Sequence, residues 1–398
     1  MKKIYFILAI SIFISSLQLQ AQDSTNVKFT NERILYTIGL NEVPNGCNLP
    51  LIGFVNKAKG NHSGLQLGFL NSNSANFKGL QVGFANTVGE SNSGAQVGFF
   101  NTVSQSTQGL SVGFFNTNGN SASGLQTGFF NTLGNSFSGI QCGFFNTLGN
   151  SGKGLQVGFF NTLGNSYKGL EVGFFNTLGN TIEGTQIGFF NTVGNTAQGL
   201  QIGFVNTVGN KTEGAQIGFI NTTKKLSAFQ LGFINRVDTV VKGIPVGFLS
   251  FVKKGGYQVI ELGTTEMFPV NLSYKTGIKE FYTSIILSYN PISQNHYGIG
   301  MGIGSIIPIN EKLNFNPEFI SQTTCTVLWD QIYNLHLNLN YKLSEHFSLS
   351  GGPTVVWNHL QNGSTLHEPV IYIYKNEINS RNNILVGLNV ALNYQFGK

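Results

Sequence analysis

Charged residues are scarce in this chain: Asp, Glu, Lys and Arg together make up 10% of its 398 residues. The net charge of +6 comes with no dense run of Lys and Arg and no basic-aromatic cluster, so we expect no nucleic-acid partner. Beyond the first residues, no segment approaches eighteen continuous apolar residues, which excludes helical membrane spans in the mature chain.

Cysteine is rarer still, and Cys47, Cys142 and Cys325 lack the spacing of metal ligands. Cys142 stands in an apolar column of the repeat described below, so we expect a small buried residue there. A disulfide between Cys47 and Cys325 is possible in an exported protein, although spacing alone does not bring the two together.

Motifs of catalysis and cofactor binding are missing as well. The six histidines are scattered without an H-E-x-x-H pair, and no G-x-S-x-G nucleophile elbow occurs. The glycine-rich segment 298–304 has Ile303 where a dinucleotide-binding loop needs its third glycine. We therefore expect no metal, no cofactor and no enzymatic activity.

The N-terminus has the pattern of a secretory signal peptide, which we place at residues 1–21. Lys2 and Lys3 precede an apolar run from Ile4 to Ile14, and a cut after Ala21 is plausible. The mature chain is thus predicted to be exported, with residues 22–48 forming a lead-in to the next segment.

Glycine is abundant, with 51 residues, and it precedes phenylalanine at a fixed step of fifteen residues. The pairs run from Gly53-Phe54 to Gly218-Phe219 and continue, after one slip of a single residue, to Gly247-Phe248. The unit reads G-L-Q-V-G-F-F-N-T-L-G-N-S-x-x and predicts a stacked repeat domain over residues 49–252. Its invariant columns are the candidate structural residues of three central units: Gly143, Phe144, Asn146, Gly158, Phe159, Asn161, Gly173, Phe174 and Asn176.

Within one unit, the alternation of side chains predicts a β-strand with one buried face. Leu155, Val157 and Phe159 share one face, and Gln156 takes the other. Because Phe160 is also apolar, strict alternation breaks there and we expect a bend; residues 163–166 then supply turn chemistry.

Two architectures fit this unit, a parallel β-solenoid and an antiparallel meander. The invariant Asn and Gln columns suit in-register ladders, the step hardly varies, and the terminal units are atypical, all of which favour the solenoid. Its sides are then expected to be rich in Gln, Asn, Ser and Thr. The alternative is one large antiparallel barrel in which the repeats are membrane strands.

Composition changes near residue 253, and residues 253–398 are predicted to form a small antiparallel β-barrel of about eight strands. The clearest strands alternate regularly over 334–343 and 387–396. The other candidate strands cover 257–262, 281–289, 297–307, 313–321, 347–357 and 370–374.

The final strand, Val390-Ala391-Leu392-Asn393-Tyr394-Gln395-Phe396, resembles the ends of bacterial outer-membrane β-barrels, although Gly397 and Lys398 follow the aromatic residue. The repeats resemble those of uncharacterised bacterial cell-surface repeat proteins built on G-L-Q-x-G-F-x-N. Both resemblances imply an envelope location in a Gram-negative bacterium. The resulting hypothesis is a non-catalytic outer-membrane surface protein that contacts membrane lipid and a glycan or envelope polymer. Its alternative is a channel formed by one large barrel.

Overall fold

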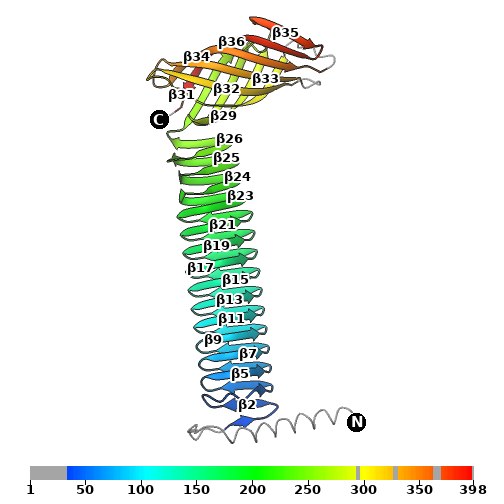
Figure 1. The fold of residues 1–398 in the computed structure, drawn as a ribbon, viewed down its shortest axis with the longest axis vertical. Coiled ribbons are helices and arrows are strands. Elements are labelled where there is room, and N and C mark those ends of the chain that lie inside the picture. The colour runs from blue at the N-terminus through cyan, green and yellow to red at the C-terminus, as the bar shows by residue number, and fades with distance from the viewer. Residues whose placement is uncertain (1–33, 293–295, 326–329, 362–368, 397–398) are drawn as a thin grey trace.

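The protein consists of a long rod that carries a β-barrel at one end (Figure 1). This computed structural model describes residues 34–292, 296–325, 330–361 and 369–396. The predicted signal peptide (1–21) and the start of the lead-in segment lie outside these ranges. The described residues include no helix with the length and apolar character needed to cross a membrane.

The rod is a parallel β-solenoid of about 14 turns, as the sequence predicts. Each coil pairs in register with the coils before and after it, so that Phe160 of one coil pairs with Phe145 and Phe175 of its neighbours. Every pairing between successive coils is parallel, which rules out the alternative of an antiparallel meander or a single large barrel.

A typical coil contains a long strand and a short strand. The long strands are β5 (His62–Leu67), β7 (Phe77–Val82), β9 (Asn92–Val97), β11 (Ser106–Val112), β13 (Ser121–Thr127), β15 (Ser136–Cys142), β17 (Ser151–Val157), β19 (Ser166–Val172) and β21 (Thr181–Ile187). The short strands are β4 (Val55–Ala58), β6 (Leu70–Asn73), β8 (Ala85–Val88), β10 (Phe100–Val103), β12 (Phe115–Asn118), β14 (Phe130–Leu133), β16 (Phe145–Leu148), β18 (Phe160–Leu163), β20 (Phe175–Leu178) and β22 (Phe190–Val193).

Near the barrel the strands of each coil merge into single long ones. These are β23 (Thr196–Thr212), β24 (Ala215–Leu226), β25 (Phe229–Val240) and β26 (Ile244–Lys254). The one-residue slip of the repeat falls here, because Val208 pairs with Thr223 whereas Lys211 pairs with Lys225. The pairing between β23 and β24 thus shifts by one residue between Val208 and Lys211, and parallel pairing continues on both sides of the shift.

Each coil bends twice. The expected bend lies at Gly158-Phe159, where the chain leaves the long strand, and Gly164-Asn165 returns it to the next long strand. A Cβ atom on Gly158 would lie 2.5 Å from the carbonyl oxygen of Gly143 and 2.5 Å from Nδ2 of Asn146. Glycine recurs at this column because the neighbouring coil occupies the space of any side chain.

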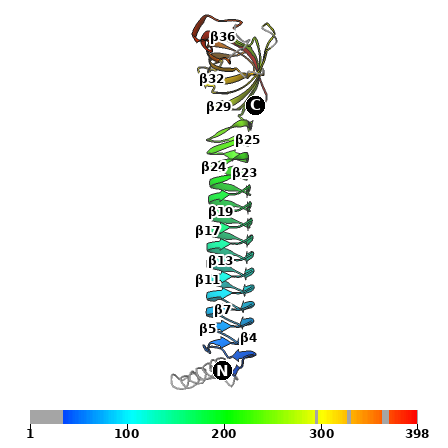
Figure 2. The same ribbon diagram turned by 90° about the vertical axis from the view of Figure 1, so that its right-hand side faces the viewer.

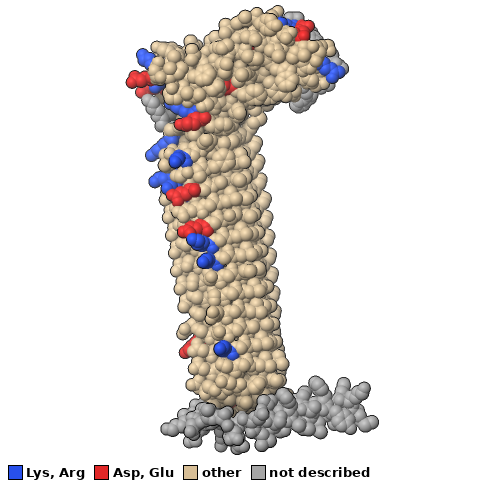
Figure 3. Space-filling view, viewed as in Figure 1, with Lys and Arg blue, Asp and Glu red and all other residues tan. Residues whose placement is uncertain are grey.

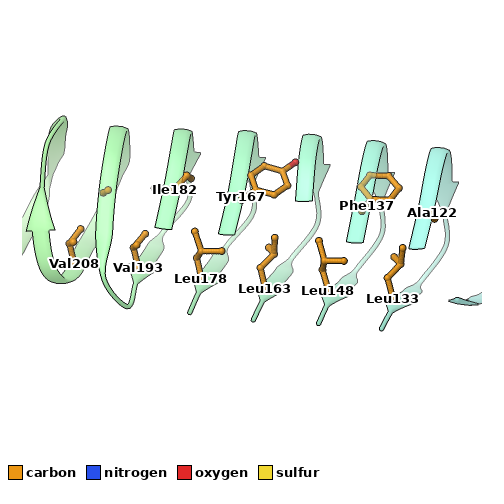
Figure 4. Packing of buried hydrophobic residues seen from close by; sticks show 11 residues of the cluster. Ala122, Leu133, Phe137, Leu148, Leu163, Tyr167, Leu178, Ile182, Val193 and Val208 are labelled. Carbon is orange, nitrogen blue, oxygen red and sulfur yellow. The ribbon is translucent and has the colours of Figure 1, made fainter. Parts of the chain in front are cut away.

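The core of the rod is narrow and consists of stacked columns (Figure 4). One apolar column is contributed by the short strands and includes Leu148, Leu163 and Leu178. It faces a second column on the long strands that changes from coil to coil and includes Phe137 and Tyr167. This second column occupies a variable position of the repeat, so its residues were not predicted to be core.

At the N-terminal end, β1 (Leu35–Tyr36) pairs antiparallel with β2 (Leu40–Val43) and covers the first coil. Strand β2 pairs in parallel with β4, and β3 (Leu51–Ile52) pairs with β5. The parallel stack therefore already includes residues 40–43 of the segment predicted as a lead-in.

The C-terminal domain is a closed antiparallel barrel of eight strands, as predicted. In order around the barrel they are β27 (Tyr257–Thr264), β28 (Val270–Ile278), β29 (Phe281–Asn290), β30 (His296–Gly304), β32 (Leu313–Thr324), β33 (Gln331–Lys342), β34 (Phe347–His359) and β36 (Asn382–Gln395). Pairing of β36 with β27 closes the barrel. Two shorter strands, β31 (Ile307–Pro308) and β35 (Tyr374–Asn379), pair antiparallel with β32 and β36, respectively.

Although the count of eight is right, two of the individual strand predictions are wrong. Strand β28 was missed, because Thr276 and Gly277 interrupt the apolar alternation that Val270, Leu272 and Tyr274 begin. Conversely, residues 370–374 form no barrel strand; β35 begins at Tyr374 and pairs only along the edge of β36.

Candidate functional site

The predicted asparagine column forms an unbroken hydrogen-bonded ladder inside the rod. Asn161 accepts from Nδ2 of Asn146 at 2.9 Å and donates to Oδ1 of Asn176 at 2.8 Å. It also donates to the backbone carbonyl of Val172 at 3.0 Å, next to the bend. The ladder runs from Asn41 to Asn235 with N–O distances of 2.7–3.0 Å, and all of its amides are buried. These asparagines hold the bends together and are not available to a ligand.

The glutamine column is also internal, and it is interrupted by Ser111 and by the carboxylate of Glu171. Gln156 donates to Gln141 at 2.6 Å, and Gln186 donates to Glu171 at 2.7 Å. Oε1 of Gln156 and Oε1 of Glu171 have no hydrogen-bond partner. Burial raises the pKa of the Glu171 carboxyl to about 7, although the hydrogen bond from Gln186 acts in the opposite direction.

These ladders correct our expectation about the sides of the rod. The sides were predicted to be rich in Gln, Asn, Ser and Thr, but the Gln156 and Asn161 columns both face inward. Among the repeated amides, the turn asparagines such as Asn165 are exposed. The alternation was identified correctly, whereas the side assigned to the core was not: Val157 and Phe159 point outward and are 36% and 38% exposed. Buried amides are tolerated because each one is paired with its neighbour in the next coil.

The predicted phenylalanine column forms a stacked rank of rings along one edge of the rod. The rings of Phe144, Phe159 and Phe174 are parallel, with centroids 4.9 Å apart. We call this rank the Phe edge, and its members are Phe54, Phe69, Phe84, Phe99, Phe114, Phe129, Phe144, Phe159, Phe174, Phe189, Phe204, Phe219, Phe233 and Phe248.

Further outward-pointing apolar columns flank the Phe edge. On the short strands, a second rank of rings meets the first edge-on; Phe160 lies 4.8 Å from Phe159. On the long strands, the flanking columns include Leu155 and Val157. Cys142 belongs to the Val157 column and is half-buried, so the expectation of a buried cysteine is wrong.

The opposite edge of the rod is polar. Here the turns place asparagines in an exposed ladder, which we call the Asn edge: Asn120, Asn135, Asn150, Asn165, Asn180, Asn195 and Asn210. Charged side chains gather close to it, as with Lys168 and Glu183, whose ion pair measures 2.9 Å. Figure 3 shows these charges along one side of the rod and none along the other.

A groove of about 760 Å³ follows the long strands between Asn61 and Lys153. Its walls include two outward-pointing columns that consist mostly of serine, exemplified by Ser136 and Ser138, and the second of them also contains Lys78 and Lys153. Ser121 and Ser136 hydrogen-bond to each other at 2.8 Å. Hydroxyls in such ranks can donate and accept hydrogen bonds along an extended polar ligand.

The barrel has an apolar outer surface. Large apolar side chains point outward from every strand of the wall: Leu262, Leu272, Leu287, Ile299, Met301, Ile303, Phe319, Leu335, Leu337, Leu339, Leu349, Val355, Leu388, Val390 and Leu392. The inward side chains are mostly polar and buried, and they include Ser273, Ser288, Asn334, Asn338, Asn358, Asn389 and Asn393. The wall thus has the reverse of the polarity of a water-soluble barrel.

Charged side chains close one half of the barrel lumen. Nζ of Lys275 lies 2.8 Å from a carboxylate oxygen of Glu261 and 2.8 Å from one of Glu318. Lys275 and Glu318 are each 1% exposed, and Tyr282 packs beside them with its hydroxyl accepting from Asn316 at 2.6 Å. The buried ammonium of Lys275 is thus paired with the carboxylates of Glu261 and Glu318 inside the barrel.

The connection between β27 and β28 closes the other half. Residues 265–269 fold inward, where Met267 and Phe268 pack against Ile332, Val356 and Leu385. The sequence does not predict this plug, because its short apolar dipeptide carries no signal that distinguishes a lumen segment from an ordinary turn.

The remaining chemical candidates stay apart. Among the residues that the structure describes, no group of three or more His, Cys, Asp or Glu could hold a metal ion. Cys47 is buried among Val43, Leu51 and Ala58 at the start of the rod, whereas Cys325 is exposed in the barrel. Both are free thiols, which excludes the disulfide considered from the sequence.

No protein-family model, curated protein or solved structure matches this chain. The surfaces of the rod and the barrel are therefore the basis for inferring a function.

Proposed function

We propose that this protein is a non-catalytic outer-membrane surface protein. In this proposal the barrel anchors the chain in the membrane, and the rod provides an extended structural and binding surface. The observation that carries the proposal is the polarity of the barrel wall, with an apolar outer surface and a polar, hydrogen-bonded interior.

The resemblances seen in the sequence support the same location. A final strand that ends on Phe396 and an N-terminal signal-peptide pattern are typical of exported outer-membrane barrels. The alternative of a channel required the repeats to be strands of one large barrel. The repeats pair instead as parallel coils and do not enlarge the barrel wall.

A charged side chain on the outer wall tests the anchor. Leu337 lies midway along β33 and points outward, so Leu337→Lys should disfavour insertion by about 2–4 kcal/mol at the membrane midplane. The measurement is the fraction of heat-modifiable protein after folding of the full chain into phosphatidylcholine vesicles. Thr162→Lys, an outward position on the rod, is the matched control and should insert like the unmodified chain.

The proposal would be overturned if the unmodified chain stayed folded and monomeric in buffer without detergent and did not enter vesicles. It would also be overturned if both lysine variants inserted equally well.

For the rod, the proposed ligand class is a glycan or another uncharged envelope polymer, held by the hydroxyl-lined groove. A glycan array probed with the detergent-solubilised full chain tests this assignment. Binding that is lost in Ser136→Ala with Ser138→Ala and kept in Thr147→Ala would support it. A blank array would remove the glycan from the proposal and leave the anchor intact.

A further inference from the structure

The apolar surface around the Phe edge is continuous, and no element among the described residues covers it. Four outward columns, those of Leu155, Val157, Phe159 and Phe160, contain no Asp, Glu, Lys or Arg in any coil between Ile52 and Leu249. With about 14 coils spaced by ~4.8 Å, this surface is roughly 65 Å long. Exposed apolar patches larger than a few hundred Å² mark interaction sites.

The junction with the barrel determines which way this surface faces. The last coil, β26, packs on β28 and β29, and it covers outward-pointing positions of the barrel wall. Val252 packs with Ile278, which lies next to the β28–β29 turn at the rim of the barrel. Farther from the rim, Thr283 donates a hydrogen bond to the carbonyl of Phe248, the last member of the Phe edge, at 3.1 Å. The Phe edge therefore lies toward the body of the barrel, and the Asn edge lies toward its rim.

The rod also runs crosswise to the barrel. In Figure 1 the barrel strands lie across the long axis of the rod, and Figure 2 looks into the barrel nearly along its own axis. A barrel that spans a bilayer has its axis across the membrane. A rod that starts on its outer wall and extends crosswise must then run along the membrane and not away from it.

We propose that the rod lies along the same membrane leaflet as the barrel rim, with the Phe edge in contact with lipid. This inference rests on the proposed function of the barrel as a membrane anchor. The partner is the apolar and interfacial region of the bilayer, which accommodates aromatic and aliphatic side chains, while the charged Asn edge faces water. The rod would thereby brace the protein over a strip of membrane far longer than the barrel is wide.

The backbone of the rod is compatible with such surroundings. Lipid tolerates only segments whose backbone N–H and C=O groups are paired within the protein. In the rod these groups bond from coil to coil, even at the bends, where the N–H of Phe160 donates to the carbonyl of Phe144 at 2.9 Å. The last coil ends on the barrel, where Thr276 donates to the carbonyl of Ser250 at 2.7 Å.

A second copy of the chain is the competing occupant of the Phe edge. Lipid is favoured because the junction holds this edge against the outer wall of the barrel, whose exposed side chains are apolar. A dimer of rods would instead need the edge to face water or a partner barrel.

Lipid-borne quenching tests the proposal with a reporter that the chain already carries. Cys142 lies beside Phe144 at the Phe edge, and it can be labelled with the fluorophore NBD in a Cys47→Ala, Cys325→Ser background. The full chain is folded into phosphatidylcholine vesicles with and without a doxyl-labelled phosphatidylcholine. Two further single-cysteine proteins, carrying Asn150→Cys or Leu337→Cys with Cys142→Ala, report on the Asn edge and the barrel wall.

We expect doxyl lipid to quench the labels at 142 and 337 to a similar extent, and iodide in the buffer to quench only the label at 150. If 337 is quenched by lipid while 142 is quenched only by iodide, the rod projects into water; the lipid contact is then wrong and the anchor stands. If 142 is shielded from both quenchers, a second copy covers the edge, which also overturns the lipid contact.

A label at 337 that lipid does not quench would instead refute the anchor itself. Should the label at 142 disturb folding, judged by loss of heat-modifiable mobility, Val157→Cys in the same outward column replaces it, with the same expected outcomes.

Discussion

Single residues in this protein are constrained by their copies in the neighbouring coils. Asn161 satisfies its own amide, the amide of Asn146 and a bend carbonyl at once, so its role depends on every coil having the same residue. Such a ladder has the geometry of stacked amides in cross-β structures. Where a residue of a different type replaces the repeated one, as Glu171 does in the glutamine column, a polar atom in the interior is left unpaired.

Glu171 is the clearest such break. If it were ionised, neither of its oxygens could donate to Oε1 of Gln156, which stands unpaired beside it. The proton that the raised pKa retains gives the carboxyl a donor and allows it to complete the glutamine ladder. Stability should therefore depend on the protonation of this one side chain.

We predict that Glu171→Gln stabilises the protein above neutral pH. In the unfolded chain the carboxyl has its ordinary pKa of about 4.5, whereas in the folded rod the pKa is about 7. Stability should be unaffected below pH 4.5, fall as the pH rises from about 4.5 to 7, and stay low above it. The loss is on the order of 3 kcal/mol at pH 8, and the glutamine variant should lack it.

Urea unfolding of the full chain in detergent, followed by circular dichroism between pH 4 and 8, measures this difference. Glu183→Gln changes an exposed carboxylate of the next coil and should leave the pH dependence as it is. Equal pH dependence in the Glu171→Gln variant and the unmodified chain would contradict the prediction.

At the scale of elements, the coil is the unit of structure. Each coil contributes one member to every column, and its contacts are with the coil before and the coil after. Register is specified by the bends, where glycine at the Gly158 column permits close approach and asparagine ties the bend to the next coil. Whole coils should thus be removable, whereas parts of coils should not.

We predict that deletion of residues 154–168 shortens the rod by one coil, ~4.8 Å, and preserves the fold. The cut joins Lys153 to Gly169, which occupies the same column as Gly154. Solution scattering gives the length of the particle in detergent, and heat-modifiable gel mobility reports on the barrel.

Deletion of residues 154–162 is the control for this experiment. It brings Leu163 into the column of Gly154, where the coil before it leaves no room for a side chain, and it removes a bend. We expect this shorter deletion to abolish folding. Normal assembly of both variants would show that register between coils matters less than the ladders indicate.

At the scale of the whole molecule, the barrel closes both the rod and its own lumen. Its outer wall covers the last coil through Thr276, Ile278 and Thr283, an edge that would otherwise offer unpaired strand groups. Its lumen is filled by the Lys275 cluster in one half and by residues 265–269 in the other. The molecule is therefore a filled barrel carrying a rod.

We predict that the full chain inserted into planar lipid bilayers produces no stable current steps, because buried side chains occupy both halves of the lumen. Conductance at protein densities that give clear steps with a porin checks this. Large, regular steps from the unmodified chain would reinstate a channel function.

The sequence by itself determined the fifteen-residue repeat, the two-residue alternation within its strands and the position of its bends, and it favoured the solenoid without excluding the meander. These follow from periodicity, because a fifteen-residue step with paired glycines and a two-residue alternation are local properties of the chain. Glu171 and Ser111 also stand out in the sequence, because they replace glutamine in its column.

Only the tertiary structure decided which face of each strand is the core. Alternation divides side chains into two sets, but it does not say whether Gln156 or Val157 points inward; that depends on whether stacking neighbours can satisfy buried amides. In the same way, the sequence alone does not show that Lys275 and Thr276 belong to a strand of the barrel. Their burial in β28 depends on Glu318 and Ser250, which lie far away along the chain. The Phe edge faces the barrel body because of contacts at the junction, where residues distant in sequence meet. No local sequence pattern encodes this orientation.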